Sequence, residues 1–137
     1  MLAVGRALAL VAVVLGLRRE AGSPSTEEEP EGWRAALEGL AALRGDGPPL
    51  LYLHAGEGID PEAPVLEKLA RHFKVTAIAH PGFGLSETSP HFRTVDDLSY
   101  FYLDYLDVNG LKDVTVVGSD IGAWIALEVA VKDCSRI

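Results

Sequence analysis

Three short apolar runs, each followed by a loop and then by a helix-like segment, constrain the fold of this chain most. The runs cover residues 50–54, 74–79 and 113–118 and carry the aliphatic and β-branched side chains of buried strands. Strands that alternate with helices fold into a parallel sheet with right-handed crossovers. We therefore predict a three-layer α/β protein, with these strands as parallel neighbours in a mostly parallel sheet and helices on both of its faces.

Helix signals lie between and after these runs. Thr94 and Asp97 have the spacing of a capping box, and the helix that they open should continue to about residue 108, where Asn109-Gly110 ends it. A second apolar helix is predicted over residues 123–132, directly after the third run.

Two further helices are expected nearer the N-terminus. Asp60 and Pro61 suit the N-cap and the first position of one of them. Its apolar face would consist of four residues at helical spacing, Val65, Leu66, Leu69 and Phe73. The other helix, over residues 33–45, would place Trp33, Leu37 and Leu40 on one face and end at Gly45.

The first 32 residues differ in composition from the rest. Residues 1–22 contain an apolar run of eleven residues, 7–17, which is too short to cross a bilayer as a helix. The run has the length of a signal peptide core, but the Arg18-Arg19 pair follows it. We expect a cytoplasmic protein, with export or membrane anchoring through residues 1–22 as the alternative. Residues 23–32 are typical of a flexible acidic linker, and the domain would span residues 33–137.

The charge balance and the cysteine count limit the possible partners. The chain has 20 Asp and Glu residues against 12 Lys and Arg residues, a net charge of −8, whereas a nucleic-acid binder needs a basic face. Its single cysteine, Cys134, excludes a disulfide within the chain, and no group of residues has metal-ligand spacing. Gly82 and Gly84 lack the third glycine of a dinucleotide-binding loop. We expect no metal, no cofactor and no nucleic acid.

The loop after the third run is the strongest candidate for a functional site. In parallel sheets, function lies at the carboxyl ends of the strands, and Gly118-Ser119-Asp120-Ile121-Gly122 stands between such a strand and a helix. Small residues on either side of the central position permit a strained turn that exposes the central side chain. We expect Asp120 to have unusual backbone angles there, with its carboxylate facing the loop that contains Gly56. Ser119 stands one position too early to be presented in this way.

Over roughly residues 48–137 the chain resembles the N-terminal half of an α/β-hydrolase. The resemblance rests on L-Y-L-H-A-G at 51–56, A-H-P-G-F-G-L-S at 79–86 and G-S-D-I-G-A-W at 118–124. It implies that Asp120 is the nucleophile, framed by Gly118 and Gly122. It also implies an oxyanion hole formed by the N–H of Ile121 and by one N–H of the first loop, that of Gly56 or Ala55.

An Asp at the nucleophile position resembles the epoxide hydrolase and haloalkane dehalogenase branch of that family. This implies a small-molecule substrate, an epoxide or an alkyl halide. A carboxylate attacks such an alkyl carbon to give an ester, which an activated water then cleaves with help from the oxyanion hole. Attack on an ordinary ester would give a reactive anhydride, so carboxylesterase activity fits Asp120 poorly.

The chain departs from that branch in three places. The 54–58 loop has no proline, Ile121 stands where many dehalogenases have Trp, and a helical pattern replaces the strand hairpin that precedes the first loop in the family. The alternative is a truncated or degenerate member without catalysis, which acts as a binding or structural module.

The histidines bear on this alternative. All four, His54, His72, His80 and His91, precede Asp120, whereas the family's catalytic His comes after the nucleophile. Only fifteen residues follow Gly122, so we expect the hydrolase domain to be incomplete at its C-terminus and the chain to be inactive by itself. His54 resembles the family's loop histidine, which shapes the oxyanion loop, whereas His72 is expected on the surface and His80 in turn packing.

Overall fold

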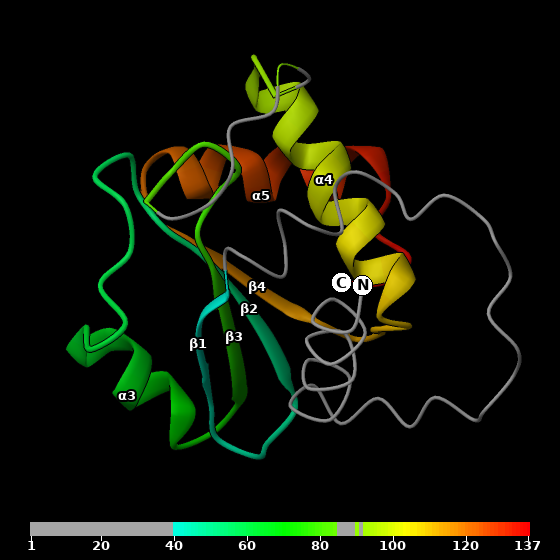
Figure 1. The fold of residues 1–137 in the computed structure, drawn as a ribbon. Helices are drawn as coiled ribbons and strands as arrows, with labels where there is room; N and C mark the ends of the chain where they lie inside the picture. The colour runs from blue at the N-terminus through cyan, green and yellow to red at the C-terminus, as the bar shows by residue number, and fades with distance from the viewer. Residues whose placement is uncertain (1–39, 85–89, 91) are drawn as a thin grey trace, which may run out of the picture.

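The computed structural model describes residues 40–84, 90 and 92–137; the predicted segment 1–22, the linker 23–32 and His91 lie outside that part. The elements are, in order, β1 (Leu40–Arg44), β2 (Pro49–Leu53), α3 (Pro64–Ala70), β3 (Lys74–Ile78), α4 (Val95–Val108), β4 (Thr115–Gly118) and α5 (Ile121–Lys132). Figure 1 shows their arrangement.

The four strands form one sheet in the order β1-β3-β2-β4. β2 lies at the centre and pairs in parallel with both β3 and β4, with Leu53 opposite Ile78 on one side and opposite Gly118 on the other. The predicted parallel sheet is therefore confirmed, although β3 and β4 are neighbours of β2 and not of each other. β4 begins two residues later than predicted, after Asp113, whose backbone is left-handed with φ 53°.

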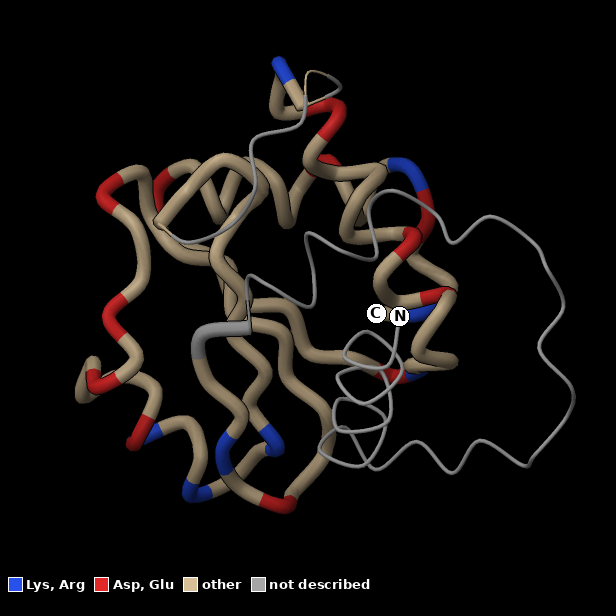
Figure 2. The backbone as a smooth tube through the Cα atoms, in the orientation of Figure 1, with Lys and Arg blue, Asp and Glu red and all other residues tan. Residues whose placement is uncertain are grey.

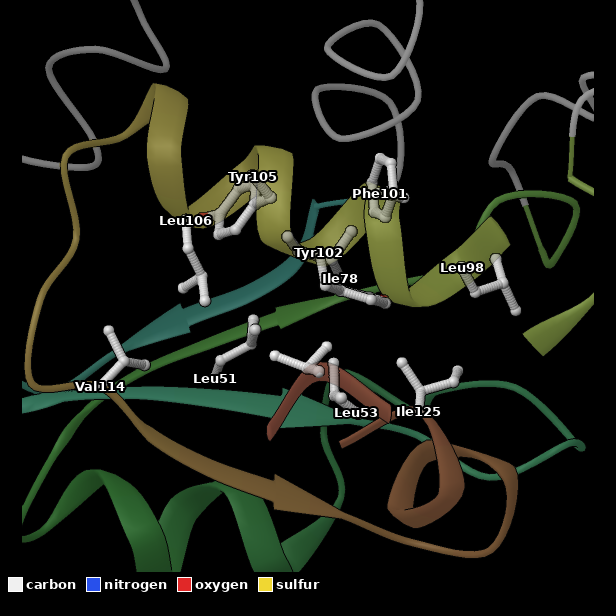
Figure 3. Close-up of a cluster of buried hydrophobic side chains, with 11 residues drawn as sticks. Leu51, Leu53, Ile78, Leu98, Phe101, Tyr102, Tyr105, Leu106, Val114 and Ile125 are labelled. Carbon is white, nitrogen blue, oxygen red and sulfur yellow. The ribbon is translucent and has the colours of Figure 1, made fainter. Parts of the chain in front are cut away.

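Helices cover both faces of the sheet, as predicted (Figure 1). Alternate side chains of β2 point to opposite faces, because successive residues of a strand alternate. Leu50 packs with Leu66 of α3, whereas Leu51 and Leu53 pack under α4 and α5. The larger cluster, shown in Figure 3, also contains Ile78, Leu98, Phe101, Tyr102, Tyr105, Leu106, Val114, Ile125 and Val129.

The helix predicted over residues 33–45 is wrong over residues 40–44, which form the antiparallel edge strand β1. β1 pairs Ala42 with Ala77 and Arg44 with Val75 of β3. Helix propensities differ by at most about 0.7 kcal/mol per residue among ordinary residues, so ladder hydrogen bonds and the burial of Ala42 outweigh them. Residues 33–39 of the predicted helix lie outside the described part.

The helix predicted to start at Asp60 begins instead at Pro64. The residue before a proline is driven out of the helical region, and Ala63 has the extended angles φ −56° and ψ 129°. A helix that began at Pro61 could not pass through Ala63. The predicted apolar face is only partly correct, because Leu66 is fully buried whereas Val65 is 41% exposed.

The other helix predictions are confirmed. Thr94 and Asp97 form the predicted capping box, in which each side chain accepts from the other residue's backbone N–H. α4 ends at Val108, before Gly110 with φ 60°. α5 begins at Ile121, two residues earlier than predicted, so its first turn lies directly beside Asp120.

Charged residues of both signs lie mainly in the loops and on the helices, and the middle of the sheet carries none (Figure 2). Within the described part of the chain, no helix has both the length and the apolar composition needed to cross a bilayer.

Candidate active site

Asp120 occupies a strained turn between β4 and α5. Its backbone angles are φ 52° and ψ −118°, a combination that residues with a side chain rarely adopt. Apart from Asp113, it is the one described non-glycine residue with a positive φ. Such outliers cost about 1–3 kcal/mol each and gather at functional sites. The predicted position and backbone of Asp120 are thus confirmed.

The two glycines that frame Asp120 allow β4, α5 and β2 to approach closely. A Cβ on Gly118 would lie 2.3 Å from the carbonyl oxygen of Gly122, and a Cβ on Gly122 would lie 2.1 Å from the carbonyl oxygen of Leu53. Both contacts are with backbone atoms, which cannot move aside as a flexible side chain could. The turn around Asp120 therefore requires glycine at both positions.

The carboxylate of Asp120 faces the loop after β2, as predicted. The N–H of Gly56 donates to its Oδ2 across 3.4 Å, a long hydrogen bond. Within the described residues the N–H of Ile121, at the start of α5, has no acceptor. A free N–H at a helix start stabilises negative charge, and the helix end adds about 0.3–1 kcal/mol for an anion. The N–H of Gly56 thus contacts the carboxylate of Asp120, and the N–H of Ile121 belongs to the residue that directly follows Asp120.

Ala55 and Ser119 contribute less directly to the site. The carbonyl oxygen of Ala55 accepts from the N–H of Gly58, which closes the loop into a tight turn. The backbone of Ser119 continues the ladder beyond β4, since its N–H donates to the carbonyl oxygen of Leu53 at 3.0 Å. The turn therefore exposes the side chain of Asp120, and the backbone of Ser119 anchors the turn to β2.

Two histidines are buried beneath this loop. His54 follows β2, His80 lies just after β3, and their rings stack with centroids 3.7 Å apart. Burial lowers the pKa of both rings, that of His80 from 6.5 to about 4, so both are neutral at pH 7. Both nitrogens of each ring are hydrogen bonded inside the fold, so neither ring is free to activate a water.

The third described histidine, His72, lies far from the candidate nucleophile. His72 is exposed, as predicted, and lies just before β3 begins. It is therefore at the opposite end of the parallel strands from Asp120. None of the three described histidines can serve as a base at Asp120.

Sequence reasoning missed Tyr102, whose buried hydroxyl contacts His80. The prediction that His80 packs within its turn accounts for only part of its contacts. One signal was present, because two neighbouring apolar runs are each followed closely by a histidine, and parallel pairing brings such residues together. No such signal marked Tyr102, because its role depends on how α4 crosses the sheet.

The fold and the strained turn define a class of protein: an α/β protein with a strained strand-to-helix turn at the carboxyl edge of a mostly parallel sheet. The family described as the alpha/beta hydrolase fold matches residues 48–137. The chain belongs to this family. No curated protein sequence matches it.

Solved structures support the same fold. A marine microorganism esterase superimposes with a TM-score of 0.64 at 20% identity, over 69% of this chain and 37% of the esterase. A Pseudomonas aeruginosa protein described as an epoxide hydrolase gives 0.57 at 24% identity, over 69% of this chain and 33% of its own length. A 2-hydroxy-6-oxo-6-phenylhexa-2,4-dienoate hydrolase from a Rhodococcus species gives a TM-score of 0.60 at 24% identity, over 69% of this chain and 37% of its own length. The chain thus spans about a third of the length of these hydrolases.

Proposed function

We propose that this chain supplies the nucleophile of a hydrolase that acts on epoxides or alkyl halides through Asp120. The observation that supports this most is the combination of a carboxylate at the strained turn with the N–H of Gly56 directed at its Oδ2. That hydrogen bond holds one carboxylate oxygen and leaves the other, Oδ1, to attack.

In the first step, Oδ1 of Asp120 would form a bond to an alkyl carbon of the substrate. With a haloalkane, the carbon–halogen bond breaks and halide leaves with the electron pair. With an epoxide, the ring carbon–oxygen bond breaks and the ring oxygen takes a proton from water. The product in both cases is an alkyl ester of Asp120.

In the second step, water would attack the carbonyl carbon of this ester. The negative charge that develops on the carbonyl oxygen would be stabilised by the N–H groups of Gly56 and Ile121. The bond from that carbon to the ester oxygen would then break, and the leaving oxygen would take a proton from the attacking water, which releases the alcohol and re-forms the carboxylate of Asp120. This step needs a base to activate the water, a contribution of about 10²–10⁴-fold, and no described histidine is placed to provide it. We therefore infer that the ester accumulates on this chain.

The test is to incubate the chain with a terminal epoxide or a primary haloalkane and to measure its intact mass. We expect a stable adduct, which peptide mapping locates on Asp120. The Asp120→Asn variant should form none. Asp113→Asn is the matched control, because Asp113 is also an exposed Asp with a left-handed backbone, and this variant should still be labelled.

Two outcomes would contradict the proposal. If no adduct forms on Asp120, the chain is a non-catalytic family member, the alternative stated above. If simple carboxylic esters are turned over and this turnover survives in Asp120→Asn, the nucleophile is a different residue.

A further inference from the structure

The two buried histidines hold the ends of β2 and β3 together through a reciprocal pair of hydrogen bonds. The backbone N–H of His80 donates to Nε2 of His54 at 2.8 Å, and Nε2 of His80 lies 2.9 Å from the carbonyl oxygen of His54. The exposed fractions are 1% for His54 and 0% for His80. Water therefore cannot replace either partner, and the geometry is set by the protein alone.

These contacts determine where each ring carries its proton. A backbone N–H only donates, so Nε2 of His54 is unprotonated and its Nδ1–H donates to the carbonyl oxygen of Ala55 at 2.6 Å. A carbonyl oxygen only accepts, so Nε2 of His80 is protonated and its Nδ1 is an acceptor. The two neighbouring histidines thus have opposite tautomers.

Tyr102 of α4 completes this chain of hydrogen bonds. Its hydroxyl lies 2.6 Å from Nδ1 of His80, and its ring meets that of His80 edge to face. The side chain is fully buried, and burial raises the pKa of the phenol, which remains protonated and donates to Nδ1. The hydroxyl of Tyr102 therefore stabilises the tautomer that the carbonyl oxygen of His54 requires of His80.

The hydrogen bonds that begin at Tyr102 end at the peptide that contains the candidate oxyanion donor. The carbonyl oxygen that His54 Nδ1–H contacts and the N–H of Gly56 belong to the same planar peptide unit, Ala55–Gly56. Because that unit is rigid, fixing its carbonyl oxygen fixes the direction of its N–H. The N–H of Gly56 is the group directed at Oδ2 of Asp120.

We propose that Tyr102 and His80 are positioning residues for the reaction at Asp120, because they orient the Ala55–Gly56 peptide through His54. This inference rests on the proposed function for its kinetic part and on the hydrogen bonds alone for its structural part. It assigns a role to α4, an element that contributes no reacting group.

The structural part is tested by ¹⁵N-edited NMR of the histidine rings in the full chain. In the unchanged protein, we expect the Nδ1–H tautomer for His54 and the Nε2–H tautomer for His80. Tyr102→Phe removes the hydroxyl without changing the ring, so the Nδ1 resonance of His80 should move to that of an unbonded acceptor. The backbone amide resonance of Gly56 should move as well.

Tyr105→Phe is the matched control. Tyr105 lies one turn further along α4 and is also buried, but it makes no hydrogen bond or ring contact with His54 or His80. Its variant should leave the ring resonances and the Gly56 amide unchanged. If Tyr102→Phe and Tyr105→Phe give the same Gly56 resonance, the inference is overturned.

The kinetic part is tested by the rate at which the haloalkane adduct forms on Asp120. We expect Tyr102→Phe to lower the maximal rate about tenfold with little change in the haloalkane concentration at half-maximal rate, because the peptide orients the nucleophile and does not bind substrate. Tyr105→Phe should keep the original rate. Equal rates in both variants would also overturn the inference.

Failure of the proposed function gives a different result. If the unchanged chain forms no adduct, the proposed reaction is wrong, and the tautomers and the Gly56 resonance alone decide the structural part.

His80→Gln is a second variant, used if Tyr102→Phe does not fold. It keeps a side-chain N–H for the carbonyl oxygen of His54 but loses the stacked ring, and it should shift the Gly56 amide. An unshifted Gly56 amide in this variant would refute the proposed connection.

Discussion

Replacing Gly122 with alanine tests the close approach of α5 to β2 that creates the turn at Asp120. The added Cβ would lie 2.1 Å from the carbonyl oxygen of Leu53 and 2.6 Å from that of His54. Ordinary van der Waals contact begins at 3.4 Å, so the helix and the strand must separate by about 1.3 Å. The carbonyl oxygen of Leu53 belongs to β2, which is held by ladders on both sides, and that of His54 follows directly after it.

Two opposing effects decide the size of the change in stability. Alanine is the better helix former and favours the folded state by up to about 1 kcal/mol over glycine. Overpacking against atoms that cannot repack costs about 1–3 kcal/mol. If the helix instead moves away, a gap of about 0.5–1 Å beneath it reduces the dispersion energy of each contact by a quarter to a half. That gap would open beneath Ile125 and Val129, which are 0% and 1% exposed. We expect a net loss of about 2 kcal/mol.

The measurement is urea unfolding of the full chain, followed by far-UV circular dichroism. Gly110→Ala is the control, because Gly110 has φ +60° and a Cβ there would meet nothing within 4 Å. The free energy of unfolding of that variant should fall only by the cost of an alanine in the left-handed region, about 1 kcal/mol. If Gly122→Ala is as stable as the unchanged protein, or more stable, the close approach does not govern this turn.

Three further predictions concern the site and the fold. Asp120→Gly should stabilise the chain by about 1 kcal/mol in urea unfolding, because release of the backbone strain exceeds the entropic cost of glycine, while adduct formation is lost. Because burial lowers the pKa of His80 from 6.5 to about 4, its contribution to stability is complete above pH 6.5 and decreases by about 3 kcal/mol as the pH falls to about 4. Unfolding free energies of His80→Gln across this range should therefore show a shallower slope. Thr94→Ala should cost about 1 kcal/mol through the lost cap of α4, measured by thermal unfolding, and an unchanged midpoint would mean that the cap does not hold the helix.

Local patterns were sufficient to predict the parts of the fold that depend on neighbouring residues. The three parallel strands, the capping box at Thr94 and Asp97, and the strained turn at Asp120 each follow from residue types within a few positions. The turn was predictable because glycines at positions 118 and 122 have a steric meaning that hardly depends on the rest of the chain. The role of Asp120 in a reaction remains a proposal.

Where two signals competed, local reasoning was wrong. Asp60-Pro61 predicted a helix start, but the helix begins at Pro64 because this proline excludes Ala63 from the helical region. That error was avoidable from the sequence. The error at β1 could not be avoided from the sequence, because Leu40–Arg44 has a helical composition and becomes a strand only through pairing with β3.

The sequence by itself therefore determined the alternation of strands and helices and the turn that exposes Asp120, because these depend on local sterics and periodicity. Only the tertiary structure decided that residues 40–44 form an edge strand and that Tyr102, His80 and His54 form one chain of hydrogen bonds. The physical reason is that both features join segments far apart in the chain. The hydrogen bond between Tyr102 of α4 and His80, just after β3, can form only when the folded sheet brings these two residues together.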